Sequence, residues 1–233
     1  MARRVGFAYG STMPNSAQPF ADESATPPVR GFIHHPSTAS GNGLVLTHGA
    51  GGNAQAGLLV ALAEAFADAG SVTLRCNLPF RLRRPYGPPG KGDAGRDREG
   101  LKNAIRAVRA FAGEKVFVGG QSYGGRQASM LCADEPGVAD GLLLLSYPLH
   151  PPGRPEQLRT QHLPNLRTPV LFVEGTSDPF GAIPEIEAAL KLIPAKHALL
   201  TVEGAGHDLG FKGKSRREGL PGQILEEFQR LFG

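Results

Sequence analysis

Residues 116–125 have the sequence Val-Phe-Val-Gly-Gly-Gln-Ser-Tyr-Gly-Gly, in which a short apolar run leads into a G-x-S-x-G pattern. A helix-compatible run, residues 126–132, follows directly. Strand, sharp turn and helix in this order are the setting of a nucleophile elbow, which exposes a serine at the turn. Gly120 and Gly124 let the strand and the helix pack closely around a strained Ser122. The stretch therefore predicts an α/β sheet with Ser122 just beyond the carboxyl end of a strand.

Short apolar runs alternate with helical patterns along the rest of the chain. We interpret the runs 44–47, 72–74, 116–118, 142–145, 170–173 and 198–202 as buried strands, and 29–33 as an edge strand. Apolar residues recur at helical spacing in 58–66, 101–111, 183–192 and 220–231. Strands that are apolar throughout must be covered on both faces. We predict one α/β domain over residues 29–233, with an open, mostly parallel sheet and helices on both faces, after a partly irregular lead-in of residues 1–28.

Length and composition support this architecture. The chain has 233 residues, of which 40% are hydrophobic, enough for one sizeable core and too many for a wholly disordered chain. Two cysteines build no disulfide framework, and their spacing to histidine suggests no metal site. The longest apolar run is far too short to cross a bilayer, and no apolar segment follows Arg3 and Arg4. We expect a cytoplasmic protein without a metal, a cofactor or a membrane partner.

Much of the excess positive charge lies in residues 75–98. The formal net charge is +4, and this stretch is also rich in proline and glycine, which indicates a solvated loop. A surface that attracts acidic substrates is the alternative, and it remains open at this point. Nucleic acid is the least favoured of the three interpretations of this charge.

Two further strand ends carry the residues that a serine nucleophile needs. A serine hydroxyl needs a base and an orienting acid, and in this fold the chain order is serine, acid, histidine. Asp178 follows the strand 170–173, and His207 follows the strand 198–202. Asp208 and Glu174 are rival acids. We predict a triad of Ser122, His207 and Asp178.

A glycine-rich turn, residues 48–53, follows the strand 44–47 and reads His-Gly-Ala-Gly-Gly-Asn. It is close to the H-G-G-G type that supplies a backbone N–H to an oxyanion hole. We expect the donors to be the amides of Tyr123 and of Ala50 or Gly51. The same glycines match a dinucleotide-binding fingerprint, but the acidic residue that it requires at the end of the next strand is missing: residues 75–77 are Arg-Cys-Asn.

Four separated motifs resemble the serine α/β-hydrolase superfamily. They are HGAGG at 48–52, GGQSYGG at 119–125, GTSDPFG at 175–181 and GAGHDL at 204–209. The segments 75–80, 147–152 and 178–181 are similar to a small dienelactone-hydrolase-like branch, which includes predicted bacterial hydrolases. The resemblance implies esterase or acyl-hydrolase chemistry on a small molecule. Dienelactone hydrolases proper use a cysteine nucleophile, and Ser122 departs from that pattern.

The interval between the strands 142–145 and 170–173 bears on access to the site. Its residues 147–168 number only about twenty and include five prolines, so we expect one short helix at 156–163 and no large cap domain. His150 in this interval, with Arg81 and Arg84 in the basic segment, are candidate substrate contacts. We expect a serine esterase or related acyl hydrolase, and the alternative is a catalytically silent hydrolase-fold module that binds protein partners.

Overall fold

A computed structural model describes residues 16–211 and 217–233 of the chain. Its strands form one eight-stranded sheet in the order β1-β2-β4-β3-β5-β6-β7-β8. The strands are β1 (Gln18–Asp22), β2 (Val29–His34), β3 (Gly43–Thr47), β4 (Val72–Cys76), β5 (Val116–Gln121), β6 (Gly141–Leu145), β7 (Val170–Gly175) and β8 (His197–Val202). The pairs β1–β2 and β2–β4 are antiparallel and the others are parallel, so the predicted open, mostly parallel sheet is confirmed.

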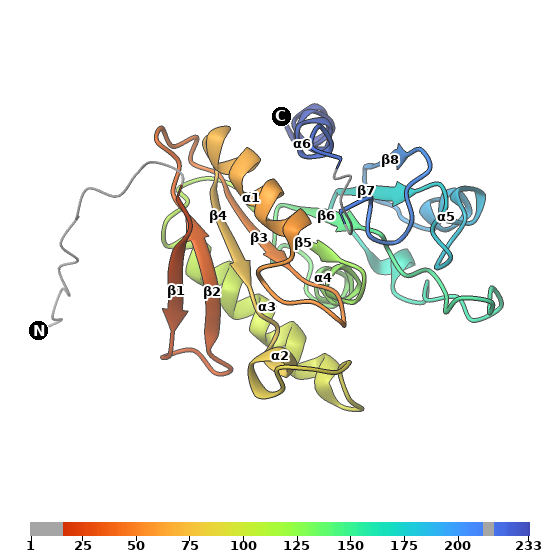
Figure 1. The fold of residues 1–233 in the computed structure, drawn as a ribbon, viewed down its shortest axis with the longest axis horizontal. Helices are drawn as coiled ribbons and strands as arrows, with labels where there is room; N and C mark the ends of the chain where they lie inside the picture. The colour runs from red at the N-terminus through yellow and green to blue at the C-terminus, as the bar shows by residue number, and fades with distance from the viewer. Residues whose placement is uncertain (1–15, 212–216) are drawn as a thin grey trace, which may run out of the picture.

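Helices cover both faces of this twisted sheet (Figure 1). They are α1 (Gly57–Asp68), α2 (Pro79–Arg83), α3 (Asp93–Arg109), α4 (Tyr123–Asp134), α5 (Ile183–Leu190) and α6 (Leu220–Phe232). Side chains of α1 and α6 share one hydrophobic cluster with alternate residues of β3, β6 and β7. Side chains of α3, α4 and α5 share a second cluster with the other residues of these strands. The central strands are apolar throughout because each one buries both faces.

Three parts of the fold differ from the prediction. β1 lies within the segment 1–28 and takes the sheet edge, so β2 is an inner strand, whereas we expected 29–33 to be the edge. Its five residues bury only part of each side chain, which leaves no apolar run in the sequence. Residues 1–15 of the predicted lead-in lie outside the described residues.

The other two differences concern short helices. α2 forms in the segment that we interpreted as a solvated loop, and it begins with Pro79, a residue suited to the first turn. The helix expected at 156–163 is absent, and the structure has only the 3₁₀ turn Leu163–Asn165. Between β6 and β7 there is accordingly no cap domain.

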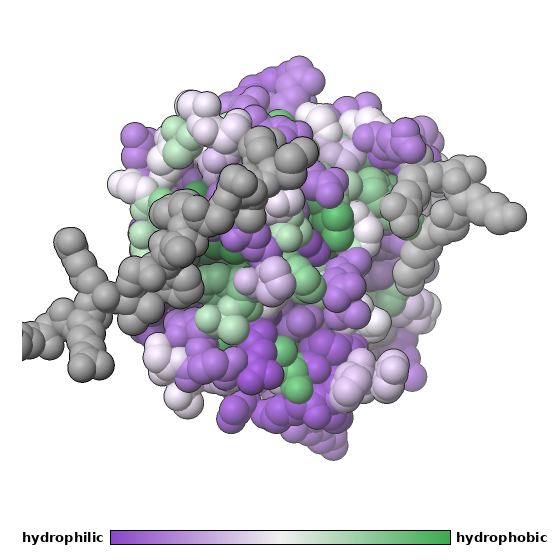
Figure 2. Space-filling model, turned by 60° about the vertical axis from the view of Figure 1, so that its left-hand side comes forward, coloured by the Kyte–Doolittle hydropathy of each residue, from purple (hydrophilic) through white to green (hydrophobic). Residues whose placement is uncertain are grey.

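The visible part of the face on the β1 side of the molecule is mainly hydrophilic, with small hydrophobic areas between the polar residues (Figure 2). None of the helices among residues 16–211 and 217–233 is long and apolar enough to cross a membrane.

Candidate active site

Ser122 occupies the sharp turn between β5 and α4. Its backbone has φ 51° and ψ −118°, a conformation that a residue with a side chain rarely adopts. Its N–H donates to the carbonyl of Leu145 at the end of β6 (2.8 Å), which ties the turn to the sheet. A Cβ at Gly124 would lie 2.5 Å from the carbonyl oxygen of His48, so only glycine fits there. The close packing holds Ser122 in its strained turn.

His207 and Asp178 meet Ser122 at the carboxyl edge of the sheet. The Ser122 hydroxyl donates to Nε2 of His207 across 2.8 Å, and Nδ1 of the same ring donates to Oδ2 of Asp178 across 2.7 Å. The Asp178 side chain is 1% exposed and that of His207 is 26% exposed. The other carboxylate oxygen of Asp178 accepts the N–H of Phe180 (2.9 Å). The structure thus brings together the three residues at separate strand ends, in the order that proton transfer requires.

The two rival acids have other partners. Asp208 accepts the N–H of Gly210 (3.0 Å), within its own turn. Glu174 is fully buried, and one of its oxygens accepts the N–H of Tyr147 (2.7 Å). Burial raises the pKa of Glu174 well above its usual range, and the charge of Asp178 adds to the effect. Burial therefore favours the neutral form of Glu174, which makes it a poor partner for an imidazolium.

The glycine-rich turn after β3 lies against Ser122. The position of a Cβ on Gly49 is 3.3 Å from Cβ of Ser122. In the described part of the chain, the backbone N–H groups of Ala50, Gly51 and Tyr123 donate no hydrogen bond. These are the amides that the sequence suggests as oxyanion donors.

His48 is buried behind this turn as a neutral ring. Its Nδ1 donates to the carbonyl of Gly49 (2.8 Å), and its Nε2 accepts the N–H of Leu78 (3.1 Å). Burial, together with the charge of Arg81, lowers the pKa of His48 to about 4, against the opposing effect of the Gly49 carbonyl. One tautomer is fixed by the two partners.

The arginines of the basic segment have partners within the protein. Arg81 is 7% exposed and donates to backbone carbonyls, including those of Ala50 (2.7 Å) and Gly52 (2.8 Å). Arg83 and Arg84 both pair with Asp93, and the Arg84 pair measures 2.6 Å. Hydrogen bonding from the Gly90 N–H lowers the pKa of Asp93, and both arginines contribute. Part of the segment that the sequence presents as a charged loop is thus buried and hydrogen-bonded to the turn 48–53.

The model of the alpha/beta hydrolase domain family matches residues 40–227. The chain belongs to this family. The sequence's resemblance to serine α/β-hydrolases of the dienelactone-hydrolase-like branch is confirmed.

Solved structures with the same fold cover nearly the whole hydrolase domain. A dienelactone hydrolase from Anabaena variabilis is 23% identical, with a TM-score of 0.71 over 93% of this chain and 99% of its own. Est1E from Butyrivibrio proteoclasticus is 15% identical, with a TM-score of 0.69 over 92% and 98%. An α/β serine hydrolase without a lid from Xanthomonas campestris is 15% identical, with a TM-score of 0.66 over 96% and 98%. At these identities the likeness is one of fold.

His150 contacts the loop of the hydrolase domain that carries Asp178. Its ring lies 2.8 Å from the carbonyl of Pro151 and 3.2 Å from the carboxylate of Glu185. The Pro151 carbonyl, followed by Glu185, raises the pKa of His150. Its backbone N–H donates to the carbonyl of Phe180 (3.0 Å). The sequence suggests His150 as a candidate substrate contact. In the structure, its ring and its backbone N–H contact groups of the protein itself.

Two supports of the site escaped the sequence analysis. Phe180 stacks on His207, with ring centroids 4.1 Å apart. Asp97 is buried and accepts both the Tyr123 hydroxyl (2.8 Å) and the Phe80 N–H (2.9 Å). Burial raises the pKa of Asp97. Asp97 precedes the helical pattern 101–111 that the sequence shows, in the basic segment, and gave no signal of this role, whereas the position of Phe180 two residues after Asp178 did offer one.

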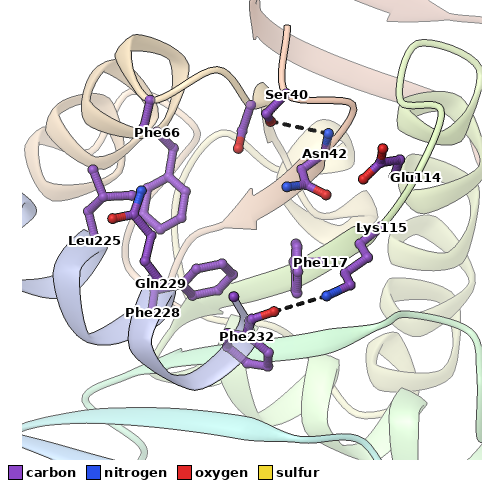
Figure 3. Close-up of a pocket in the computed structure, with 13 residues that line it drawn as sticks. Ser40, Asn42, Phe66, Glu114, Lys115, Phe117, Leu225, Phe228, Gln229 and Phe232 are labelled. Atoms are coloured by element: carbon purple, nitrogen blue, oxygen red, sulfur yellow. Dashed lines mark hydrogen bonds between the residues drawn. The ribbon is translucent and has the colours of Figure 1, made fainter.

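A cavity of about 230 Å³ lies at the opposite edge of the sheet. It is bounded by α1, α6 and the residues that precede β3, β4 and β5, with the rings of Phe66, Phe117, Phe228 and Phe232 on its walls (Figure 3). Lys115 closes one side by donating to the carbonyl of Phe232 (2.9 Å). Since Ser122, Asp178 and His207 lie at the carboxyl ends of the strands, this cavity is separate from them. Among residues 16–211 and 217–233, no group of three His, Cys, Asp or Glu side chains is suited to a metal ion.

Proposed function

We propose that this protein is a serine hydrolase that cleaves carboxylic esters or related acyl bonds of small molecules. The observation that carries the proposal is the continuous hydrogen-bonded chain from Ser122 through His207 to Asp178, with distances of 2.8 and 2.7 Å. A nucleophile, a base and an orienting acid in this relation are what acyl transfer requires.

The mechanism follows from the roles of these atoms. The Ser122 oxygen attacks the acyl carbon while His207 Nε2 takes its proton. Asp178 holds the imidazole in the required tautomer and stabilises the imidazolium. The amide of Tyr123 and an amide of the turn 48–53 stabilise the negative charge that develops on the carbonyl oxygen. His207 then gives this proton to the leaving group as the bond between it and the acyl carbon breaks, which leaves the acyl group on Ser122. Water attacks the same carbon while His207 takes its proton, and the acyl–Ser122 bond breaks as His207 gives that proton to the Ser122 oxygen.

The loop between β6 and β7 bears on substrate size. It contains one 3₁₀ turn and no domain that folds over the triad. An open site of this kind suits small or extended esters more than substrates that need full enclosure.

Labelling by a fluorophosphonate probe tests the proposal directly. We expect the folded protein to be labelled and to hydrolyse p-nitrophenyl esters, and Ser122→Ala to lose both properties. A panel of acyl chain lengths then defines the substrate. If the folded protein is neither labelled nor active on any ester, the proposal fails and a silent hydrolase-fold module that binds protein partners replaces it.

A further inference from the structure

Arg81 is a buried cation whose hydrogen bonds all go to backbone carbonyls, and its guanidinium also lies over the ring of Phe80, 4.9 Å from the centroid. Nε donates to Gly52 (2.8 Å), and one terminal nitrogen donates to Ala50 (2.7 Å) and Gly87 (3.0 Å). The other terminal nitrogen donates to Arg84 (3.1 Å). No carboxylate pairs with Arg81 anywhere in the described ranges. Since burial of a charge is costly without such a partner, the position of this guanidinium needs an explanation.

The explanation lies in the planarity of the peptide group. In a trans peptide the C=O and the N–H point in opposite directions. Arg81 holds the carbonyl of Ala50, so the N–H of Gly51 in the same plane points away from α2. His48 holds the carbonyl of Gly49, which fixes the N–H of Ala50 in the same way. The two candidate oxyanion donors are thus the free ends of two peptide planes whose other ends are held.

Packing does not fix the second of these planes. A Cβ on Gly51 would meet nothing within 4 Å, and glycine accepts a wide range of backbone angles. The Gly52 N–H donates to the Gly49 carbonyl (3.0 Å) and closes the turn, but neither of these groups belongs to the Ala50–Gly51 plane. Without the guanidinium this central plane would be able to rotate, and a rotated plane would present a carbonyl oxygen where a donor is needed. Gly49, which precedes Ala50, lies against Ser122.

We propose that Arg81 is a positioning residue that orients the Gly51 amide toward the oxyanion, with His48 doing the same for Ala50. The inference rests on the proposed serine hydrolase function. The positive charge acts in the same direction, because a cation bonded to the carbonyl of a peptide polarises its N–H and favours nearby negative charge. Arg81 thereby stabilises the transition state without touching the substrate.

Two variants of Arg81 and one control test this role. Arg81→Met keeps the aliphatic stem and removes every donor, and Arg81→Lys keeps the charge but forms fewer bonds. Arg96→Met removes an exposed arginine near the start of α3 as the control. Removing an oxyanion donor outright costs about 10²–10³ in kcat, so we expect Arg81→Met to lower kcat by about 10–10² with little change in KM. Arg81→Lys should fall between, and Arg96→Met should match the unmodified protein.

A trifluoromethyl ketone separates orientation of the donors from general loosening of the site. The Ser122 oxygen adds to its carbonyl carbon and forms a tetrahedral oxyanion, whereas the matching methyl ketone binds mainly as a neutral ligand. We expect the affinity for the trifluoromethyl ketone to fall across the variants in step with kcat, and that for the methyl ketone to stay constant. Equal losses for both ketones, or a folded Arg81→Met variant with unchanged kcat, would overturn the inference.

The remaining outcomes are distinguishable as well. An unmodified protein that hydrolyses no ester and takes up no trifluoromethyl ketone contradicts the proposed function itself, whereas an active protein indifferent to Arg81 contradicts only this inference. If neither Arg81 variant folds, the crystal structure of the unmodified protein with the trifluoromethyl ketone decides. The adduct oxygen must accept the N–H of Gly51 with Arg81 still on the Ala50 carbonyl, and an oxygen that does not accept the Gly51 N–H refutes the role.

Discussion

The ring of Phe180 stacks on the imidazole of His207, with centroids 4.1 Å apart and planes inclined by 26°. The same residue donates its backbone N–H to Asp178, so Phe180 contacts the proposed base through its ring and the proposed acid through its backbone. An aromatic face beside a histidine holds the ring in place and favours the imidazolium that the proposed mechanism requires.

Phe180→Ala removes the ring and keeps the backbone donor. A pair of stacked rings contributes about 0.5–1.5 kcal/mol, so we expect kcat/KM for an ester to fall by a factor of about 2 to 10. Leu192→Ala is the matched control, because it truncates a large apolar residue that is 44% exposed just beyond α5. Steady-state kinetics of both variants would check this, and an unchanged kcat/KM in folded Phe180→Ala would leave the ring without a role in catalysis.

Asp178→Asn and Asp208→Asn distinguish the two acids next to the base. The loss of the carboxylate in a serine triad lowers kcat by about 10⁴, and we expect a loss of about 10³–10⁴ for Asp178→Asn. Asp208→Asn should retain kcat within a few fold, since an amide oxygen still accepts the Gly210 N–H. The kinetics of p-nitrophenyl ester hydrolysis measure both. The reverse pattern would assign the acid to Asp208.

Glu174 provides a prediction about stability and pH. Its pKa is raised by burial, so as the pH rises above the ordinary range of a glutamate the unfolded chain releases the proton and the folded protein keeps it. The folded state then binds more protons, and its stability falls with rising pH. Glu174→Gln keeps the oxygen that accepts the Tyr147 N–H and removes the titration. We expect its melting temperature to exceed that of the unmodified protein by several degrees at pH 8 and by less at pH 5.

Thermal unfolding monitored by circular dichroism at the two pH values would test this. Glu185→Gln is a suitable control, because the Ala182 N–H lowers the pKa of Glu185 and so shifts it in the opposite direction. If the gain in melting temperature of Glu174→Gln over the unmodified protein is smaller at pH 8 than at pH 5, Glu174 is ionised in the folded protein.

The sequence was sufficient to predict the parallel strands and the residues at their ends. Apolar runs mark strands that are buried on both faces, and glycine comes within two residues after four of them. They placed Ser122, Asp178 and His207 at the carboxyl ends of the strands. β1 and α2 were missed because each has five residues and a proline, too few for a periodic pattern. The helix expected at 156–163 does not form in a segment with prolines on both sides.

The direction of the arginine side chains was beyond sequence reasoning. A cluster of positive charge in a proline-rich segment predicts exposure, yet Arg81 is buried against the turn 48–53. Its partners are backbone carbonyls, which every residue has, so no acidic residue in the sequence indicated the contact. The partner of Arg83 and Arg84, Asp93, is nearby in sequence but is one of several acids there.

Gly124 and Gly95 each lie in the first turn of a helix and offer a matched pair of substitutions. A Cβ at Gly124 would lie 2.5 Å from the His48 carbonyl oxygen and 2.7 Å from the Thr47 side chain, whereas a Cβ at Gly95 would meet nothing within 4 Å. Forcing a methyl group into a closely packed contact costs roughly 1–3 kcal/mol, so we expect Gly124→Ala to lower the free energy of unfolding by that amount. It should also reduce kcat, because α4 must move away from the turn that holds the oxyanion amides. Gly95→Ala should raise the free energy of unfolding by at most about 1 kcal/mol, since alanine loses less backbone entropy in a helix. Urea unfolding of the two variants measures the difference, and equal stabilities would mean that strand and helix do not approach as closely around Ser122 as the elbow requires.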